Sequence, residues 1–568
     1  MQSNRQKLRS QQLLTAFLII FSIILFNIIS QNVFFRLDLT SEKRYTISEQ
    51  TKLILSNLDD VVFIRIYLDG DLNIELNRFR KNIAELLDEF KVYAGNRLEY
   101  EFADPFDGAD AKTIDRILEE LYNKGLAPVN IHQRKKDGSI TEKVIVPGAI
   151  INYNDSEISL NLLMNNPGKT GAENLNNSVE LLEYNLISTI KNLTNNEITK
   201  IAFLEGHGEW PDPFIGDLLK ELSKSFQIDR GKLNNKADVL EPYKAVVIAG
   251  SINAFSEADK FIIDQYIMRG GKVLWLIDGV NIDFDSLATG YSFALPNNLN
   301  LDDMLFRYGV RINQNLVQDA QCGILPVNVA LAGNAPNFQP APWLYFPLVS
   351  HLGNHAITQN INLVQMRFAS SIDTLGARSA VRKTPLLSSS SYTKLREVPA
   401  LIELREINQQ PAEADFRHSS LILGVLLEGT FESVFKNRLV ENLGVENLSK
   451  KFDISPETKM IVIADADIVR NDIKHTSKGP VISPLGFDKF TNQTYGNKDF
   501  LNNAISYLAD ENHLLALRGR EFKLRMLDKT EISKNRLKWQ LINILIPAAF
   551  VLAGGIAFSL TRKFKYSR

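Results

Sequence analysis

Cysteine is almost absent from this chain, because the 568 residues include only Cys322. A single cysteine excludes an intramolecular disulfide framework and any zinc site built from several cysteines. Neither sign of charge is in excess, since 64 lysine and arginine side chains face 66 acidic ones. The balance gives no overall attraction to nucleic acid, which we do not expect as a partner. Apolar residues make up 45% of the chain, which is typical of folded globular domains.

Charged residues are missing from two stretches, one near each end of the sequence. None occurs between Ser10 and Phe35, and Trp539–Leu560 is uncharged over 22 residues. As helices, both stretches are long enough to cross a hydrocarbon core of about 30 Å. We predict a transmembrane signal anchor at 13–35 and a transmembrane helix at 539–560. A cleaved signal peptide is the alternative for the first stretch, but its apolar run is long and no A-x-A-like cleavage site follows.

Basic residues flank the predicted spans and indicate their orientation. Positive clusters lie in both tails, 1–12 and 561–568, which places both termini in the cytoplasm. A third cluster before the second span argues the other way (Lys534, Arg536 and Lys538). Two spans put both ends on one side, however, and the terminal clusters jointly favour the cytoplasm. We therefore predict a two-pass protein of the inner, cytoplasmic membrane, with the bulk of the chain in the periplasm.

The region after the first span predicts a small α/β domain over 36–164. An apolar strand at 61–68 is followed by a segment, 76–93, whose apolar residues recur at helical spacing. A second strand at 98–102 completes a βαβ unit, and a further helix is expected at 111–123. The opening resembles a thioredoxin-like layer, but it lacks a Cys-x-x-Cys pair and therefore the redox chemistry. We predict a linker at 165–177 within a linker and connecting helix over 165–195.

The region 196–510 predicts a larger parallel-sheet domain. Strands are expected at 200–204, 245–249 and 272–277, with helices between them and short connections. This alternation indicates a doubly wound sheet of flavodoxin-like or class I glutamine-amidotransferase-like outline. Later strands are predicted at 385–388, 421–427 and 459–464, after a large insertion of weak periodicity at about 281–382. The fold class is thus α/β, with two exported α/β domains, and 511–538 is expected to form a stalk leading to the second span.

Candidate ligand-binding residues follow the predicted parallel strands. Glu205, His207 and Glu209 come after the first strand of the larger domain, and Asp278 comes after the third. In a doubly wound sheet, ligands bind beyond the carboxyl ends of the strands. Carboxylates beside a histidine can bind a metal or transfer protons. The alternative is a tight Gly-His-Gly turn whose polar side chains cap nearby backbone groups.

Other motifs are incomplete. Pro167–Thr170 ends like a phosphate-binding loop, but Leu163 stands where the first glycine is required, so we expect no nucleotide site. Cys322 lacks the strand-to-helix elbow of a nucleophile, and we expect no catalytic residue there. His351 and His355 have a metal-pair spacing interrupted by Gly353-Asn354, which speaks against a helical metal pair. We predict no cofactor, no metal and no enzymatic activity.

Several motifs together carry a resemblance that covers essentially the whole chain. These are a signal-anchor span, the run Leu37-Asp38-Leu39-Thr40-Ser41-Glu42-Lys43-Arg44-Tyr45-Thr46, the turn Glu205-Gly206-His207-Gly208-Glu209, Asn502-Asn503-Ala504-Ile505-Ser506-Tyr507-Leu508 and a C-terminal span. The sequence resembles the gliding-motility-associated ABC transporter auxiliary (substrate-binding) family GldG of Bacteroidetes. The resemblance implies a non-catalytic subunit that works with a separate ABC permease and a separate ABC ATPase, and a role in gliding linked to protein secretion. It brings no catalytic residues and does not reveal the substrate.

Two other classes of function stay open from the residues alone. One is an exported hydrolase or amidase built on the larger domain. The other is a purely structural scaffold of a motility or secretion machine, which binds proteins and no small ligand. Besides the lipid bilayer, the expected partners are therefore the permease, the ATPase and an unknown substrate or machine component.

Overall fold

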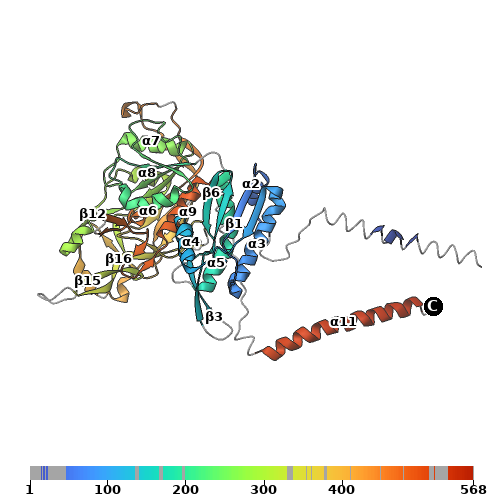
Figure 1. Ribbon diagram of the computed structural model, residues 1–568. Coiled ribbons are helices and arrows are strands. Elements are labelled where there is room, and N and C mark those ends of the chain that lie inside the picture. Colours follow the sequence, from blue (N-terminus) through green and yellow to red (C-terminus); the bar gives the residue numbers. More distant parts are fainter. Residues whose placement is uncertain are drawn as a thin grey trace, which may run out of the picture. The chain divides into compact units, whose positions relative to one another are not determined.

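A computed structural model describes residues 46–566 and, in addition, 14–15, 17–19 and 21–22. The description omits 135–139, 165–169, 195–198, 329–336, 354, 360, 377–379, 410, 448–449, 477–478, 511–513, 515–516 and 518–534. The chain divides into two compact units, 1–520 and 521–568. Within the first unit, residues 46–194 and 199–509 build different hydrophobic cores, and we call these two regions the N-terminal domain and the larger domain. The structure is mixed α/β, as expected (Figure 1).

The N-terminal domain contains a four-stranded sheet in the order β2-β1-β5-β6. The expected βαβ unit is present, since β1 and β2 are parallel and α3 connects them. β5 is antiparallel to β1, and the β3–β4 hairpin, which the sequence did not predict as a unit, lies outside this sheet. The elements are α2 (Glu49–Ser56), β1 (Val62–Ile66), α3 (Ile74–Ala94), β2 (Leu98–Phe102), α4 (Ala111–Asn123), β3 (Val129–Arg134), β4 (Ile140–Ile145), β5 (Gly148–Tyr153), β6 (Ser156–Asn161) and α5 (Gly171–Thr194).

Local sequence signals explain where these helices begin. The side chains of Ser48, Asn73 and Asp110 each accept a hydrogen bond from a backbone N–H in the first turn of α2, α3 and α4. The apolar stripes of α3 and α5 then pack with β1 in one hydrophobic core, whereas α4 belongs to a smaller core.

The predicted linker at 165–177 is wrong in its second half. α5 begins at Gly171, and Leu182, Leu186 and Ile187 are buried in the core of the N-terminal domain. Asparagines and a glycine suggested a loop, but the apolar face that starts at Leu175 decides the structure. Residues 165–169, which include most of the incomplete phosphate-binding motif, lie outside the described residues.

The larger domain is built on a mixed sheet whose parallel half has the expected strand order. Five strands run parallel in the order β8-β7-β9-β10-β23, which is the flavodoxin-like order. Their bounds are β7 (Lys200–Leu204), β8 (Gln227–Gly231), β9 (Ala245–Ala249), β10 (Lys272–Leu276) and β23 (Ile454–Ile463).

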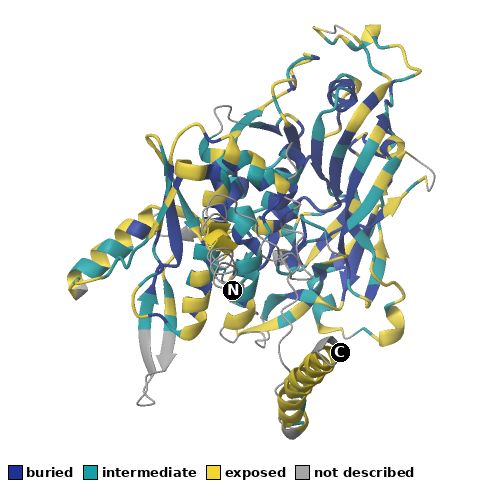
Figure 2. Cartoon of the chain, turned by 90° about the vertical axis from the view of Figure 1, so that its right-hand side faces the viewer, coloured by how far each residue is buried: buried dark blue, intermediate teal, exposed yellow. Residues whose placement is uncertain are grey.

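Helices cover both faces of the parallel half. α6 and α9 pack in a core on one face, and α7 and α8 pack in a second core on the other. Strands of the sheet are buried between these layers, as the dark ribbons of Figure 2 illustrate. The helices are α6 (Asp212–Leu222), α7 (Glu257–Met268), α8 (Asp302–Tyr308) and α9 (Asn497–Ala509).

The sheet continues beyond β23 with antiparallel strands, which corrects the expectation of a purely parallel sheet. The predicted strands at 385–388 and 421–427 exist, but as parts of β19 and β22, which run antiparallel to each other. β22 also pairs antiparallel with β23. A short apolar run predicts a buried strand but does not report its direction.

The expected insertion at about 281–382 is more regular than its composition suggested. It contributes β15 and β16 to the main sheet and forms smaller sheets with later strands. The remaining strands of the domain are β11 (Val280–Asn281), β12 (Tyr291–Pro296), β13 (Val310–Ile312), β14 (Asn315–Asp319), β15 (Cys322–Asn328), β16 (Phe338–His351), β17 (Val364–Gln365), β18 (Ile372–Thr374), β19 (Val381–Ser388), β20 (Thr393–Glu397), β21 (Ala400–Glu403), β22 (Ile422–Glu432), β24 (Ile473–Thr476), β25 (Gly479–Ile482), β26 (Phe487–Asp488) and β27 (Gln493–Thr494).

The second unit contains the helix α11 (Arg536–Tyr566). Its segment Lys538–Phe564 is long and apolar enough to cross a membrane, with a mean hydropathy of 2.2 and no buried residues in its most apolar window. Figure 2 shows this helix as exposed along its length. Among the described residues it is the one candidate span, and most of the anchor predicted at 13–35 lies outside them.

Candidate functional site

The candidate residues lie at the switch point of the parallel sheet, where the order in which the chain adds strands reverses. From β7 the chain passes to β8 on one side and afterwards to β9 on the other, so the loops after β7 and β9 meet there. This switch point is where doubly wound folds receive their ligands. The loop after β7 carries Glu205, His207 and Glu209, and the loop after β9 begins at Gly250.

His207 is buried between two carboxylates. Its Nδ1 lies 3.2 Å from Glu209 Oε1, and its Nε2 lies 3.2 Å from Asp259 Oδ2. The ring also stacks on Phe255, with 3.7 Å between the ring centroids. Burial disfavours the imidazolium, but hydrogen bonds to Asp259 and Glu209 outweigh burial and raise the pKa of His207 to about 9. At neutral pH, His207 is therefore a charged side chain with both ring nitrogens engaged.

The partners of His207 are fixed in turn. Glu209 accepts a hydrogen bond from the backbone N–H of His207 at 2.7 Å and another from Ser251 Oγ at 3.0 Å. Asp259 accepts from Ser256 Oγ at 2.7 Å, and Ser256 is the N-cap of α7. The imidazolium thus joins the loop after β7 to the first turn of α7. Its surroundings match those of a structural cation more closely than those of a free acid–base group.

The glycines of the Gly-His-Gly turn are required by its geometry. Gly206 and Gly208 have φ values of +125° and +84°, which L side chains rarely adopt. A Cβ on Gly208 would lie 2.4 Å from Ile252 Cγ1. This close approach lets the carbonyl of His207 accept hydrogen bonds from the backbone N–H groups of Ile252 and Asn253, at 2.9 and 2.8 Å. The turn consequently clamps the two switch-point loops together.

An aromatic side chain fills the edge of the same switch point. Trp210 lies so close to Gly250 that a Cβ there would be 2.5 Å from the indole ring. The indole Nε1 donates to the carbonyl of Ala466 at 3.3 Å, and the Arg470 guanidinium lies 4.7 Å from the ring centroid. The chain's own side chains therefore occupy the position in which related sheet topologies hold a ligand.

Glu205 and Asp278 do not join His207. Glu205 pairs instead with Arg230 of β8, whose Nε lies 3.0 Å from Glu205 Oε1. Asp278 accepts a hydrogen bond from the backbone N–H of Ala466 at 2.6 Å. Only His207 and Glu209 of the four predicted residues are brought into contact, so the predicted set is not one convergent site.

Asp278 belongs to a group of aspartates at the carboxyl ends of β10 and β23. Burial, with the nearby charge of Asp467, raises the pKa of Asp278 to about 7. Burial likewise raises the pKa of Asp465, whose Oδ2 accepts from the backbone N–H of Arg367 at 2.7 Å. Arg367 also forms a bidentate pair with Asp472, at 3.1 and 3.2 Å.

Arg367 and Asp472 border a polar hollow of about 280 Å³, including its open mouth, whose walls also carry Gln365, Asp467, Arg470, Pro484, Gly486, Phe487 and Asn497. Two arginines and two aspartates lie along these walls, and Arg470 also approaches Asp467, at 3.5 Å. Within the described residues, no group of three or more His, Cys, Asp or Glu side chains is arranged to hold a metal ion.

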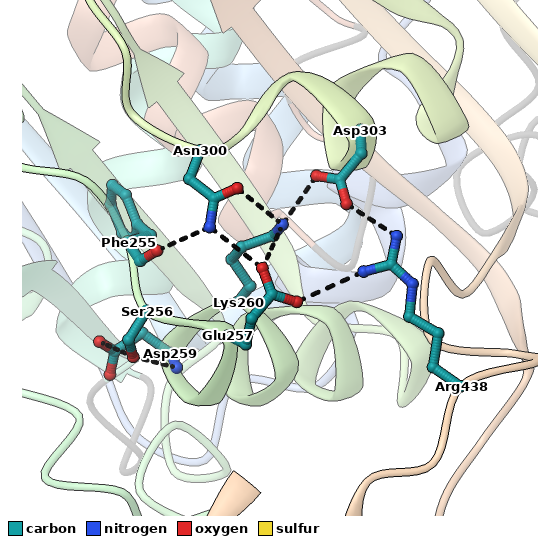
Figure 3. A network of polar contacts seen from close by, with 8 residues as sticks. All are labelled: Phe255, Ser256, Glu257, Asp259, Lys260, Asn300, Asp303 and Arg438. Carbon is teal, nitrogen blue, oxygen red and sulfur yellow. Dashed lines mark hydrogen bonds and ion pairs between the residues drawn. The ribbon is translucent and has the colours of Figure 1, made fainter.

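A second polar network continues from the N-terminus of α7 (Figure 3). Lys260, which is 1% exposed, directs its Nζ to Asp303 Oδ1 at 2.8 Å and to Glu257 Oε1 at 3.0 Å. Arg438 approaches the same two carboxylates from the opposite side, at 3.3 Å from Glu257 and 2.9 Å from Asp303. The network ties α7 to the start of α8 and to the segment after β22.

Several residues of this region were missed in the sequence. Asp259, Phe255 and Trp210 complete the surroundings of the Gly-His-Gly turn, and none of them was among the predicted site residues. A signal for Asp259 is the capping-box-like sequence Ser256-Glu257-Ala258-Asp259, which places a carboxylate on the first turn of α7. Cys322 is a free, partly buried thiol in β15, and burial raises its pKa to about 12, so it is not an activated nucleophile.

Comparison with known proteins identifies a family for the larger domain. Residues 199–504, more than half of the chain, match an auxiliary family described as an ABC-type uncharacterized transport system. Residues 41–152 match a domain of unknown function, DUF7088. A protein of Borreliella burgdorferi, described as uncharacterized, is 21% identical over 542 residues, which cover 93% of this chain and 94% of the relative.

Solved structures give low similarity scores. The IFT52 N-terminal domain is 14% identical, with 55% of this chain and 97% of that chain covered and a TM-score of 0.31. A putative ThuA-like protein from Parabacteroides merdae is 11% identical, with 55% and 90% covered and a TM-score of 0.25. These scores are too low to support a conclusion about fold or function. On the match over 199–504, the chain belongs to the auxiliary family of ABC-type transport systems.

Proposed function

We propose that this protein is a membrane-anchored, non-catalytic accessory subunit of an ABC transport complex. In this proposal a separate permease forms the transport path and a separate ATPase supplies the energy. The observation that carries the proposal is the family match over 199–504, which spans nearly all of the larger domain.

Three properties of the chain support an accessory role. The sequence holds no complete nucleotide-binding loop, so ATP hydrolysis belongs to a partner. The helix at 538–564 is a candidate anchor, and one or two spans are too few to enclose a transport path. At the switch point, His207 and Trp210 are used to hold the fold together, which favours a coupling or docking role over chemistry at this place.

The proposal includes the finer features that the sequence suggests. Both termini lie in the cytoplasm, two spans at 13–35 and 539–560 anchor the chain in the inner membrane, and the α/β domains lie in the periplasm. The process is surface gliding and the protein secretion linked to it, on the resemblance to the gliding-motility family. The candidate contacts with a ligand or partner are Glu205, His207, Glu209 and Asp278.

Purification of the intact protein from its native membranes tests the proposal. The full chain carries an affinity tag, is extracted in mild detergent, and its stoichiometric partners are identified by mass spectrometry. A polytopic permease and an ABC ATPase are expected. An unrelated tagged protein with two spans serves as the control. Recovery of neither partner, from an extract in which other membrane complexes remain intact, contradicts the proposal.

A further inference from the structure

The polar hollow beside Arg367 and Asp472 lies past the carboxyl end of a parallel strand. Asp467, Arg470 and Asp472 of its walls all belong to the segment that follows β23. Ligands of doubly wound folds bind at this edge of the sheet. At the switch point itself, Trp210 fills the edge, and its indole ring stacks with Arg470. The hollow is therefore shifted from the switch point toward β23.

Arg367 is held firmly in the wall of the hollow. Its backbone N–H donates to Asp465 Oδ2 at 2.7 Å, and its guanidinium lies 5.6 Å from the centroid of the Phe346 ring. The next residue, Phe368, has a φ of +54°, a strained value for a bulky side chain. Burial of Phe368 and a hydrogen bond from its N–H to the carbonyl of Tyr345, at 2.8 Å, hold this backbone in place. The guanidinium is thus preorganised for a bidentate partner.

Asp472 is the more exposed half of its pair with Arg367. The Asp472 side chain is 37% exposed, against 17% for Arg367. Burial disfavours the carboxylate, but the charge and hydrogen bonds of Arg367 outweigh burial and lower the pKa of Asp472. The charge of the exposed Lys489 acts on Asp472 in the same direction. If the pair separates, the carboxylate enters solvent near another cation, whereas the guanidinium is left as a buried charge without its partner.

Two further features of the hollow favour a negatively charged group. The guanidinium of Arg470 lies in its wall, with the side chain 19% exposed. Helix α9 begins in the same wall at Asn497, and its N-cap, Gly496, has no side chain to cap the first turn. A Cβ on Gly496 would lie 2.5 Å from the carbonyl oxygen of Asn362. The start of a helix attracts negative charge. Asp467, 3.5 Å from Arg470, limits this attraction and disfavours a doubly charged anion.

We propose that the hollow is a binding site for a single carboxylate group, which displaces Asp472 and takes its place on Arg367. The structure shows how Arg367 holds such a group, because two N–H groups of the guanidinium donate to Asp472 at 3.1 and 3.2 Å. A small organic acid and the C-terminus of a polypeptide both carry this group, and separate probes distinguish them. The inference concerns the larger domain alone, so it rests on neither the membrane anchor nor the partners proposed above.

Asp472 competes with the ligand from within the same chain, which keeps the affinity of the wild type low. Asp472→Asn removes the competing charge and is expected to tighten carboxylate binding by about 10- to 100-fold, the loss of a charge-assisted competitor. Glu403→Gln is the matched control. Glu403 pairs with Arg405 at 2.7 Å, at an exposed position outside the hollow, and its substitution changes the net charge by the same amount.

Thermal unfolding of the full chain in detergent measures the binding, because a ligand of the folded state raises Tm with its concentration. The probes are acetate, an acetylated trialanine peptide with a free C-terminus, the same peptide as its C-terminal amide, and inorganic phosphate, all at constant ionic strength. Both carboxylates should raise Tm of the wild type, and the amide should not. Tighter binding of the peptide than of acetate assigns the site to a polypeptide C-terminus, and the reverse order assigns it to a small acid.

Three results overturn the inference. They are a wild-type Tm that neither carboxylate raises, an equal gain in affinity for Asp472→Asn and Glu403→Gln, and tighter binding of phosphate than of either carboxylate. Arg367→Lys in the Asp472→Asn background keeps the charge but loses the bidentate geometry, and it should weaken carboxylate binding about tenfold or more. Unchanged binding there also overturns the site. If this variant does not fold, the comparison of Asp472→Asn with Glu403→Gln remains decisive.

The outcome is separable from that of the proposed function. A chain that binds carboxylates as expected but is recovered with neither a permease nor an ATPase loses the accessory role and keeps this site. A chain that is recovered with both partners but binds neither carboxylate keeps the accessory role and loses the site.

Discussion

Replacing His207 by glutamine is expected to remove a pH-dependent part of the stability of the larger domain. The ordinary pKa of 6.5 rises to about 9 in the folded protein. A group whose pKa is raised on folding stabilises the folded state fully below its unfolded pKa. The stabilisation is lost as pH rises through the folded pKa.

The magnitude follows from the two pKa values. The shift corresponds to about 3 kcal/mol below pH 6, about 2.5 kcal/mol at pH 7 and less than about 0.5 kcal/mol above pH 9. The same interactions lower the pKa values of Glu209 and Asp259, but those groups lose their contribution only in acid. Between pH 7 and pH 9, the free energy of opening around His207 should therefore fall by about 2 kcal/mol.

Hydrogen exchange of the intact protein in detergent measures this change locally. The amides of Ile252 and Asn253 both donate to the carbonyl of His207, so they report the opening of the turn. Wild-type protection, corrected for intrinsic exchange, should fall between pH 7 and pH 9, whereas that of His207→Gln should start lower and remain flat. His418→Gln, at an exposed histidine, is the matched control. Parallel pH curves for the wild type and His207→Gln would refute the reasoning.

Two further substitutions probe the same region, each with a control. Gly208→Ala should destabilise the domain by about 1–3 kcal/mol, because φ is +84° and the new Cβ meets Ile252, and a lower Tm would show it. Gly231→Ala, where a Cβ meets nothing within 4 Å, should change Tm much less, so equal losses would count against this explanation. Lys260→Met should cost about 1.5–3 kcal/mol, because it removes the hydrogen bonds of a buried ammonium group to two partly exposed carboxylates that keep Arg438 as a partner, as chemical denaturation would reveal. Lys224→Met, at an exposed ion pair, should cost at most about 1 kcal/mol, and a similar value for Lys260→Met would be inconsistent with a structural role of the buried cation.

The sequence predicted the parts of the fold that local patterns determine. The strands 98–102, 200–204 and 245–249 and the helix 111–123 coincide with β2, β7, β9 and α4. Continuous apolar runs and side-chain caps are properties of a few neighbouring residues, so they can be read without the tertiary structure. The start of α7 is a local feature of the same kind, because the side chain of its N-cap, Ser256, accepts a hydrogen bond from the backbone N–H of Asp259.

Properties that depend on distant pairing could not be predicted in this way. The direction of β19 and β22 follows from their neighbours in the sheet, and nothing within 421–427 encodes it. The helical start of α5 depends on packing against α3, which outweighs its asparagine-rich composition.

The candidate site illustrates the same limit. The spacing of Glu205, His207 and Glu209 indicated a polar turn at a strand end, and the alternative of a structural turn was stated. The second carboxylate on His207 comes from Asp259, 52 residues away, and Asp278 is separated from the turn by the intervening strand β9. Only the strand order reveals which polar residues meet.

ATP hydrolysis by the assembled complex tests the accessory role most directly. The permease and ATPase recovered with this chain are reconstituted in lipid nanodiscs with and without it, and the isolated chain is assayed alone. The chain alone should hydrolyse no ATP. When it is added to the permease and ATPase, it should bind them stoichiometrically and change the rate of ATP hydrolysis. A rate and composition that are unaffected by the chain would contradict an accessory subunit of an ABC transport complex.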